Sequence, residues 1–220
     1  MSKKIPTSQR IIDAGRWLFN ERGYAATTLN EIAAKVGISQ GNLSYYFPTK
    51  LDLARRIEAD TRAQAQLQRG QQRTGSVADD YVNHVLFAMN LMWANRFLLR
   101  DRAQFETSPE QHREELAADF ELFLALLKRA EESALIRRSA TGDIHELARA
   151  LWIVGRYWMD YLQECEGRDE ISWEDQARGI ELQFALLRPC LTASAYKQFE
   201  AALARAKSAP DTTQIQSTSS

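Results

Sequence analysis

The sequence lacks most features that mark secreted, membrane-spanning or metal-dependent proteins. Its 220 residues include only two cysteines, Cys165 and Cys190, which are far apart and match no metal-ligand spacing. We expect both to be reduced thiols in a cytosolic protein. No stretch approaches the roughly 18 consecutive apolar residues that a membrane-spanning helix needs, and the polar first residues contain no apolar signal segment. These absences predict a soluble, cytoplasmic protein that does not contact a membrane.

Sequence motifs of common enzyme classes are also missing. There is no Gly-rich phosphate loop, no Gly-x-Ser-x-Gly and no Cys-x-x-Cys, and only three histidines occur. His112 and Glu115 stand three residues apart, a spacing compatible with metal binding, with Glu114, Asp119 and Glu121 nearby. Metal sites in helical bundles take such pairs from several facing helices, and no second pair of this kind exists. We predict no catalytic residue, metal or cofactor, and keep an all-α metal-binding enzyme as an alternative.

Alternating strand patterns of useful length are absent too, whereas helical periodicity is widespread. Hydrophobic residues make up 45% of the chain, enough for a sizeable core without disulfide or metal crosslinks. The sequence therefore predicts an all-α fold. The expected helices cover about residues 8–22, 40–47, 77–96, 108–135 and 144–165, with others from 28, 49 and 172.

One segment, residues 27–50, predicts two short helices on either side of a tight turn. Thr28 and Glu31 have the spacing of a capping box at the start of the first helix. Gly37 ends that helix, because glycine tolerates the left-handed backbone found there. The second helix buries Leu43 and Phe47 on one face and leaves its polar and aromatic side chains outside. This is a helix-turn-helix pattern, whose second helix fits a DNA major groove; an ordinary helix pair with half-buried tyrosines is the alternative.

The match goes beyond that pattern, because residues 10–53 resemble the DNA-binding domain of the tetracycline-repressor (TetR) family of bacterial regulators. The residues that carry the resemblance are Ile11, Ala14, Leu18, Phe19, Gly23-Tyr24, Thr27-Thr28, Ile32-Ala33, Val36-Gly37-Ile38-Ser39, Tyr45-Tyr46-Phe47 and Lys50. Ser44 departs from the family pattern, which usually has a tyrosine there. The resemblance implies an amino-terminal three-helix DNA-binding domain, a larger helical domain for effector binding and dimerisation, and a double-stranded DNA operator as partner.

Side-chain chemistry and the resemblance together assign the DNA contacts. Thr28 and Ser39 lie at helix amino termini, which favour a phosphate oxygen. Gln40 and Asn42 carry amides that can pair with a base edge. Gly41 allows close approach of the backbone. The expected DNA-binding residues are Thr27, Thr28, Ser39, Gln40, Gly41, Asn42, Ser44, Tyr45, Tyr46 and Lys50, the last as a phosphate anchor.

Charge is distributed in a way that agrees with this assignment. The whole chain carries a formal net charge of −1, but the segment from Met1 to Arg56 holds nine basic and four acidic side chains. That segment is therefore cationic (+5) and the remainder anionic (−6). A protein of this kind is expected to contact phosphates with one end only.

The sequence divides into a DNA-binding domain at 1–48, a linker helix and loop at 49–75, a helical domain at 76–207 and a disordered tail at 208–220. Aromatic residues are frequent in the helical domain, which favours an apolar or aromatic small-molecule effector; its expected contacts are Trp93, Arg96, Phe97, Phe123, Tyr157 and Tyr161. The resemblance implies a homodimer through the last two long helices, with Leu147, Leu151, Val154, Phe184 and Leu187 as expected contacts.

The sequence thus predicts a transcriptional regulator, acting as a repressor that a small molecule releases from a palindromic operator. Activation in place of repression stays open at this point. A DNA-binding protein that responds to no ligand is the other alternative.

Overall fold

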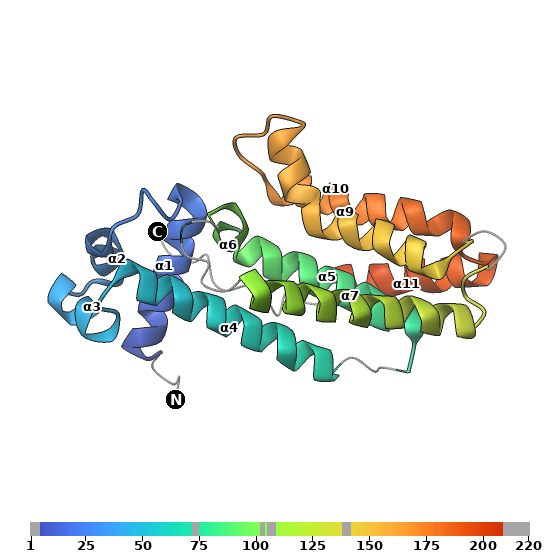
Figure 1. Cartoon of the computed structure of the whole chain (residues 1–220), viewed down its shortest axis with the longest axis horizontal. Coiled ribbons are helices and arrows are strands. Elements are labelled where there is room, and N and C mark those ends of the chain that lie inside the picture. The colour runs from blue at the N-terminus through green and yellow to red at the C-terminus, as the bar shows by residue number, and fades with distance from the viewer. Residues whose placement is uncertain (1–4, 72–74, 102–103, 105–108, 138–141, 209–220) are drawn as a thin grey trace. The chain divides into compact units, whose positions relative to one another are not determined.

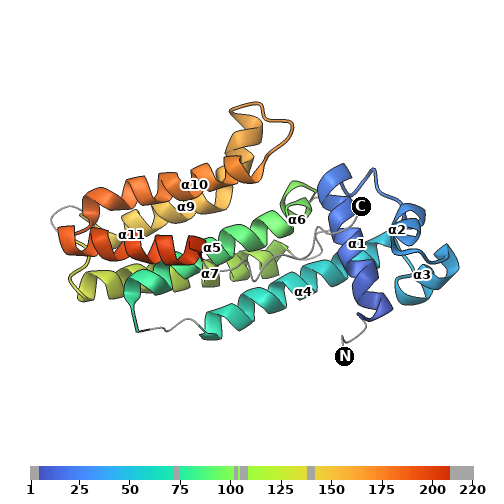
Figure 2. The same cartoon turned by 180° about the vertical axis from the view of Figure 1, so that it is seen from behind.

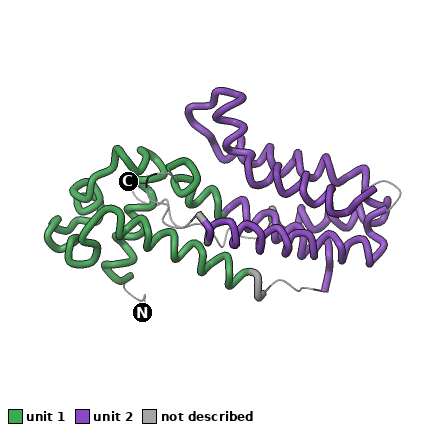
Figure 3. Tube along the Cα trace, viewed as in Figure 1, with its two compact units in different colours: residues 1–68, 91–109 green, residues 69–90, 110–220 purple. Residues whose placement is uncertain are grey.

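The computed structural model describes residues 5–71, 75–101, 104, 109–137 and 142–208, which form two compact units (Figure 1, Figure 3). Within these ranges the chain forms helices and no strand, and an isolated bridge joins Ile136 to Leu191. The all-α prediction is confirmed. The tail predicted to be disordered lies outside the described residues, apart from Ser208, which ends the last helix. Among the described helices, none combines the length and the apolar character that a bilayer crossing requires.

The first unit comprises residues 1–68 and 91–109. Its helices are α1 (Thr7–Arg22), α2 (Leu29–Val36), α3 (Gln40–Tyr46), most of α4 (Lys50–Gln71), the last turn of α5 (Val77–Ala94) and α6 (Phe97–Arg100). The fully buried side chains at its centre come from every one of these helices except α5, and they include Ile11, Phe19, Ile32, Leu43, Leu53, Ile57 and Phe97.

The second unit comprises residues 69–90 and 110–220. It contains most of α5, α7 (Pro109–Glu132), α9 (Ile144–Glu164), α10 (Trp173–Leu187), the short helix η2 (Arg188–Cys190) and α11 (Ala193–Ser208). Figures 1 and 2 show α9 and α10 side by side, next to the layer formed by α5, α7 and α11. Two glycines let α9 and α10 approach closely. A Cβ on Gly155 would lie 2.2 Å from Nε2 of Gln183, and one on Gly179 would lie 2.5 Å from the Trp158 ring.

Local sequence signals explain most helix ends. Asp143 and Ser172 cap α9 and α10 through side-chain bonds to the backbone N–H groups of His145 and Asp175. Pro189 is the second residue after the end of α10 and lies in η2, as expected of a residue that cannot continue a helix.

The two units do not follow the boundaries expected from the sequence, after residue 48 and before residue 76. Leu53, Ala54 and Ile57 of α4 are buried in the first unit, and so is Phe97 of α6. The first unit therefore includes a segment, residues 91–109, that was expected to belong to the helical domain.

Candidate DNA-binding site

Helix α3 is held in place by two apolar anchors at its buried side. Leu43 is completely buried and Phe47, the residue that ends the helix, is 7% exposed. Gly37 turns the chain between α2 and α3 with a φ of 76°, and its N–H bonds to the carbonyls of Ala33 and Ala34. The Ser39 hydroxyl then accepts from the N–H of Asn42 and caps α3. The turn and the anchors together fix which face of α3 points outward.

That outward face carries the polar and aromatic side chains predicted to touch DNA. Gln40, Gly41 and Asn42 are exposed. Tyr45 is 83% exposed and Tyr46 is 40% exposed, with their rings edge to face at 5.4 Å between centroids. Ser44 is half-buried. The face therefore offers amides, phenol hydroxyls and ring faces to a partner, with no acidic side chain along α3.

The two threonines before α2 have different environments. Thr28 forms the capping box, because its hydroxyl accepts from the N–H of Glu31 and its own N–H donates to the Glu31 carboxylate at 2.8 Å. These bonds from Thr28 lower the pKa of Glu31. Thr27 differs from the expectation of a DNA contact: its side chain is fully buried and its hydroxyl donates to the carbonyls of Leu18 and Gly23. Its role in the structure is to hold the loop before α2.

Lys50 also differs from the phosphate anchor that the sequence suggested. Its ammonium donates to three backbone carbonyls, of Tyr24 at 2.7 Å, Ala25 at 3.2 Å and Thr27 at 2.8 Å. An ammonium has three donors, so these bonds use all of them. Partial burial lowers the pKa of Lys50. The side chain therefore fastens the α1–α2 loop to the start of α4.

Two basic residues outside the expected set of DNA contacts lie beside the helix pair. Lys35 of α2 is exposed, and its ammonium lies 3.6 Å from the centre of the Trp17 ring on α1. Arg10 of α1 donates to the Val36 carbonyl at the end of α2. The sequence signal that could have found them is their positive charge within the cationic amino-terminal segment.

The end of α1 is bonded to the segment around α6. The Asn20 amide donates to the Ala94 carbonyl at 2.8 Å and accepts from the N–H of Phe97 at 3.1 Å. Arg100 donates to the carbonyls of Phe19 and Asn20 at the end of α1. A cation at this position also stabilises the negative end of the helix dipole.

Two further contacts strengthen this junction. Arg96 forms a salt bridge with Glu21 at 2.6 Å, and Asp101 accepts from the N–H of Tyr24 at 2.9 Å. The Phe97 ring lies 5.1 Å from that of Phe19. We name these contacts the α1–α6 junction; it ties α1 to the residues that immediately follow α5.

Comparison with known proteins agrees with this geometry. Residues 11–57 match the family described as "Bacterial regulatory proteins, tetR family", and residues 56–199 match "Bacterial transcriptional repressor". The chain belongs to the TetR family. It is a DNA-binding transcriptional regulator with the helix-turn-helix expected from its sequence.

Individual proteins of known name or structure resemble parts or most of the chain. A probable HTH-type transcriptional regulator, YttP of Bacillus subtilis (strain 168), is 36% identical over 47 residues, which is 21% of this chain and 23% of that protein. The match to YttP thus spans about a quarter of its length. A TetR-family regulator from Marinobacter aquaeolei VT8 has the same fold, with a TM-score of 0.69, 22% identity and coverage of 91% of this chain and 98% of the other.

Two further structures share the TetR fold. A gamma-butyrolactone receptor, an ArpA-like protein, has a TM-score of 0.67 at 21% identity and covers 90% of this chain and 95% of its own. CprB from Streptomyces coelicolor, in complex with its biological operator sequence, has a TM-score of 0.63 at 24% identity, with coverage of 91% and 96%.

The six residues expected to bind an effector divide between the two units, three in each. Arg96 and Phe97 belong to the α1–α6 junction, and half-buried Trp93 lies in the same unit, against the Arg96 guanidinium. Phe123 is buried in the second unit beside Tyr81, with 5.7 Å between ring centroids. The other two, Tyr157 and Tyr161, are 45% and 47% exposed on α9.

The five residues expected at the dimer interface are buried or half-buried in the second unit. Leu151 and Leu187 are completely buried within the second unit. Leu147, Val154 and Phe184 are half-buried, with Phe184 against Tyr81. The large apolar side chains that α9 and α10 expose are instead Ile153, Tyr157, Tyr161, Leu182 and Leu186, together with Trp173. We name the first five the exposed α9–α10 face.

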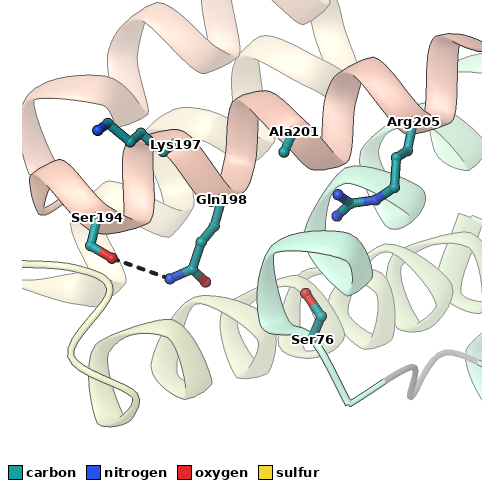
Figure 4. A pocket seen from close by; sticks show the side chains of 6 residues that line it. All are labelled: Ser76, Ser194, Lys197, Gln198, Ala201 and Arg205. Atoms are coloured by element: carbon teal, nitrogen blue, oxygen red, sulfur yellow. Dashed lines mark hydrogen bonds between the residues drawn. The ribbon is translucent and has the colours of Figure 1, made fainter.

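The lining of a surface hollow in the second unit does not fit the expected effector site. A surface hollow of about 370 Å³ lies between the start of α5 and α11 (Figure 4), lined by Ser76, Ser194, Lys197, Gln198, Ala201 and Arg205. It has no aromatic side chain, and its Arg205 forms a salt bridge with Asp79 at 2.6 Å. Within the described ranges, no group of three or more His, Cys, Asp or Glu side chains is placed to hold a metal ion.

Proposed function

We propose that this TetR-family protein represses transcription from a palindromic operator and that a small-molecule effector releases it. The observation that supports the DNA-binding half most strongly is the outward face of α3, which exposes Gln40, Asn42, Tyr45 and Tyr46 while Leu43 anchors the opposite face. The two amides read base edges in the major groove. The tyrosines contact phosphates, sugars or thymine methyl groups.

The remaining phosphate contacts come from the amino-terminal ends of α2 and α3 and from exposed cations. The positive ends of the α2 and α3 helix dipoles, which Thr28 and Ser39 cap, would lie near the DNA backbone. Lys35 replaces Lys50 as the proposed lysine contact to a phosphate, because Lys50 has its three donors bonded to carbonyls.

A dimer is part of the proposal, because one seven-residue recognition helix reads only a few base pairs. Two copies whose recognition helices are spaced about 34–36 Å apart would read two half-sites on one side of the duplex. The exposed α9–α10 face supports this, since Ile153, Tyr157 and Tyr161 form one row at helical spacing and Leu182 and Leu186 a second. Exposed apolar side chains on two neighbouring helices are typical of a protein interface.

Effector response is supported by chain continuity and by a relative. Helix α5 is one uninterrupted helix whose buried residues Tyr81, Val85 and Met89 lie in the second unit and whose last residue, Ala94, bonds to Asn20 of α1. A ligand that favours one position of α5 would act on α1 through the α1–α6 junction, provided it binds the two states with different affinity. The gamma-butyrolactone receptor with the same fold is named for a small-molecule ligand.

The test begins with genomic DNA fragments captured by the purified protein, which define the operator. Operator affinity is then measured by fluorescence anisotropy for wild type and for Gln40→Ala/Asn42→Ala. The double variant should lose at least tenfold in affinity, as loss of one base-specific contact costs about 1–3 kcal/mol. Gln64→Ala, an exposed amide on α4, is the matched control and should bind as wild type does. Unchanged affinity of the double variant would refute the role given to α3.

Ligand-independent binding is the second candidate function. It predicts that no compound in a metabolite extract of the host changes operator affinity. Release of the operator by any fraction of that extract would favour the effector-controlled repressor.

A further inference from the structure

The side chains that α2 and α3 expose limit which bases this protein can recognise. In the major groove, arginine and lysine pair with the two acceptors of guanine, whereas aspartate and glutamate accept from the amino group of cytosine. Asparagine and glutamine pair with adenine, which presents one donor and one acceptor side by side. The charged and amide side chains of the helix pair therefore indicate the bases of its operator.

The helix pair offers no side chain that suits guanine. Residues 28–47, all of which the structure describes, include no arginine and a single lysine, Lys35. Lys35 belongs to the last turn of α2, and its ammonium lies over the Trp17 ring of α1. Helix-turn-helix proteins contact bases mainly with the first residues of the second helix. Because α3 carries no charged side chain, it has no donor pair of the kind that reads guanine.

The one carboxylate of residues 28–47 is already bonded within the fold. It belongs to Glu31, which accepts from the N–H and the hydroxyl of Thr28, both at 2.8 Å. Arg22 of α1 donates to the same carboxylate at 3.0 Å. A cytosine amino group could use this acceptor only by displacing Thr28 or Arg22, which would weaken the cap of α2.

Exposed amides, in contrast, lie at the start of the recognition helix. Gln40 and Asn42 are the first and third residues of α3. Ser39 caps α3 through the backbone N–H of Asn42, so the Asn42 side chain takes no part in the cap. Within the described residues, neither side-chain amide bonds another protein group. Each amide therefore presents both its oxygen and its NH₂ group to a partner, the combination that matches adenine.

Gly41, between the two amides, leaves the middle of the outward face without a side chain. At about 100° per residue, Gly41 and Tyr45 both lie about 160° around the helix from the buried Leu43. The fold does not require glycine here, because its φ is not positive and an added Cβ would meet no atom within 4 Å outside its own stretch of helix. Glycine also stabilises a helix less than alanine does. Its value at this position lies in letting the backbone approach a base closely.

We propose that Gln40 and Asn42 determine operator specificity by pairing with the N6 amino group and N7 of adenines, so that α3 reads A·T pairs in each half-site. Gly41 lets the helix come close enough for both amides to reach the bases. The inference rests on the proposed DNA-binding function and names the bases that its site takes. Guanine at either position would place a second acceptor, O6, opposite the amide oxygen and leave both oxygens without a donor.

The first experiment selects binding sites for the full-length protein from a library of random-sequence DNA duplexes. Each half-site of the enriched sequences should contain A·T pairs at two positions that contribute most of the selectivity. Enrichment of G·C pairs at the most selective positions would overturn the proposal and leave the proposed DNA-binding function standing. Failure to enrich any sequence would instead overturn that function, and this inference with it.

The second experiment replaces single A·T pairs in the best selected duplex with base analogues and measures affinity by fluorescence anisotropy at one salt concentration. An inosine·cytosine pair has the major-groove groups of G·C but lacks the guanine amino group in the minor groove. A diaminopurine·thymine pair keeps the major-groove groups of A·T and adds that amino group. Inosine should weaken binding about fivefold or more, whereas diaminopurine should change it by less than about twofold. The opposite order would show minor-groove readout and overturn the proposal.

Variants connect each amide with one base pair. Gln40→Ala and Asn42→Ala should each bind the A·T and inosine·cytosine duplexes within about twofold of one another at one position, and a different position for each variant. The preference at the other position should persist. Lys35→Met is the matched control, because loss of a phosphate contact should weaken both duplexes equally and leave their affinity ratio unchanged. Unchanged ratios in both alanine variants would overturn the proposal.

Gly41→Ala tests the close approach of α3. An added methyl group has open space in the folded protein, so the variant should melt at or above the wild-type Tm. Its affinity for the best selected duplex should nevertheless fall about fivefold or more, because the methyl group holds the amides away from the bases. Wild-type affinity in Gly41→Ala, or a lower Tm, would contradict the role given to this glycine.

Discussion

Lys50 shows how a single residue can look like a DNA contact in the sequence and have another task in the structure. Its position after Tyr45-Tyr46-Phe47 suggested a phosphate anchor. In the fold its ammonium donates to three carbonyls of the α1–α2 loop. That loop lies 23 to 26 residues earlier in the sequence, before α2 and α3. Only the tertiary structure brings those carbonyls together, so no local pattern could have predicted them. Thr27 was misjudged for the same reason, because its burial depends on packing against α1.

A substitution tests whether the bonds from Lys50 to the α1–α2 loop stabilise the fold. Lys50→Met should lower the free energy of unfolding by about 1.5 kcal/mol, because three carbonyls lose a charged donor. Lys35→Met removes an equal charge from an exposed site and should change stability by less than half as much. Urea unfolding monitored by circular dichroism provides the measurement. Equal stability of the two variants would mean that the Lys50 bonds contribute nothing to the fold.

At the scale of helices and turns, local sequence was a good guide. The capping residues Thr28, Ser39, Asp143 and Ser172, and the left-handed Gly37, were all predictable, because each acts through backbone groups two or three residues away. Assigning helices to a unit was less successful. Phe97 and Arg96 contact α1 from a distant part of the chain, and helical periodicity contains no information about such long-range contacts.

The cap of α2 gives a pH-dependent prediction. Bonds from Thr28 lower the folded-state pKa of Glu31 below its usual value of 4.5, so ionised Glu31 stabilises the fold above that pH. The contribution is lost as the pH falls through the lowered pKa. Glu31→Gln should therefore melt below wild type at pH 7 and approach it near pH 3. Tm values measured across this range test the claim, and a constant difference between the two proteins would contradict it.

For the whole molecule, the dimer surface depends on which residues of α9 and α10 face outward. The sequence identified these helices through the family resemblance, but the expected contacts Leu151 and Leu187 are buried inside the second unit. Both faces of α9 are rich in apolar residues, so periodicity alone could not tell which face packs inside. Burial in the structure separates them and moves the proposed interface to the exposed α9–α10 face.

Charges placed on that face should prevent association. Ile153→Asp/Leu186→Asp should sediment as a monomer of 25.1 kDa at micromolar concentration, whereas wild type should sediment at twice that mass. Leu67→Asp is the control and should remain dimeric, because the Leu67 side chain is exposed on α4, outside the exposed α9–α10 face. The monomeric variant should also lose most of its affinity for a two-half-site operator, because each copy then binds alone. A dimeric double variant would place the interface elsewhere.

The central claim is that the outward face of α3 contacts DNA, and Tyr45 tests it most directly because its side chain is 83% exposed and anchors nothing. Operator affinity and Tm of Tyr45→Ala should be measured on the same preparation, beside wild type. We predict at least a fivefold loss of affinity with a Tm within about 1 °C of wild type, as expected of an exposed side chain. Full operator affinity in Tyr45→Ala, with the fold intact, would contradict the account.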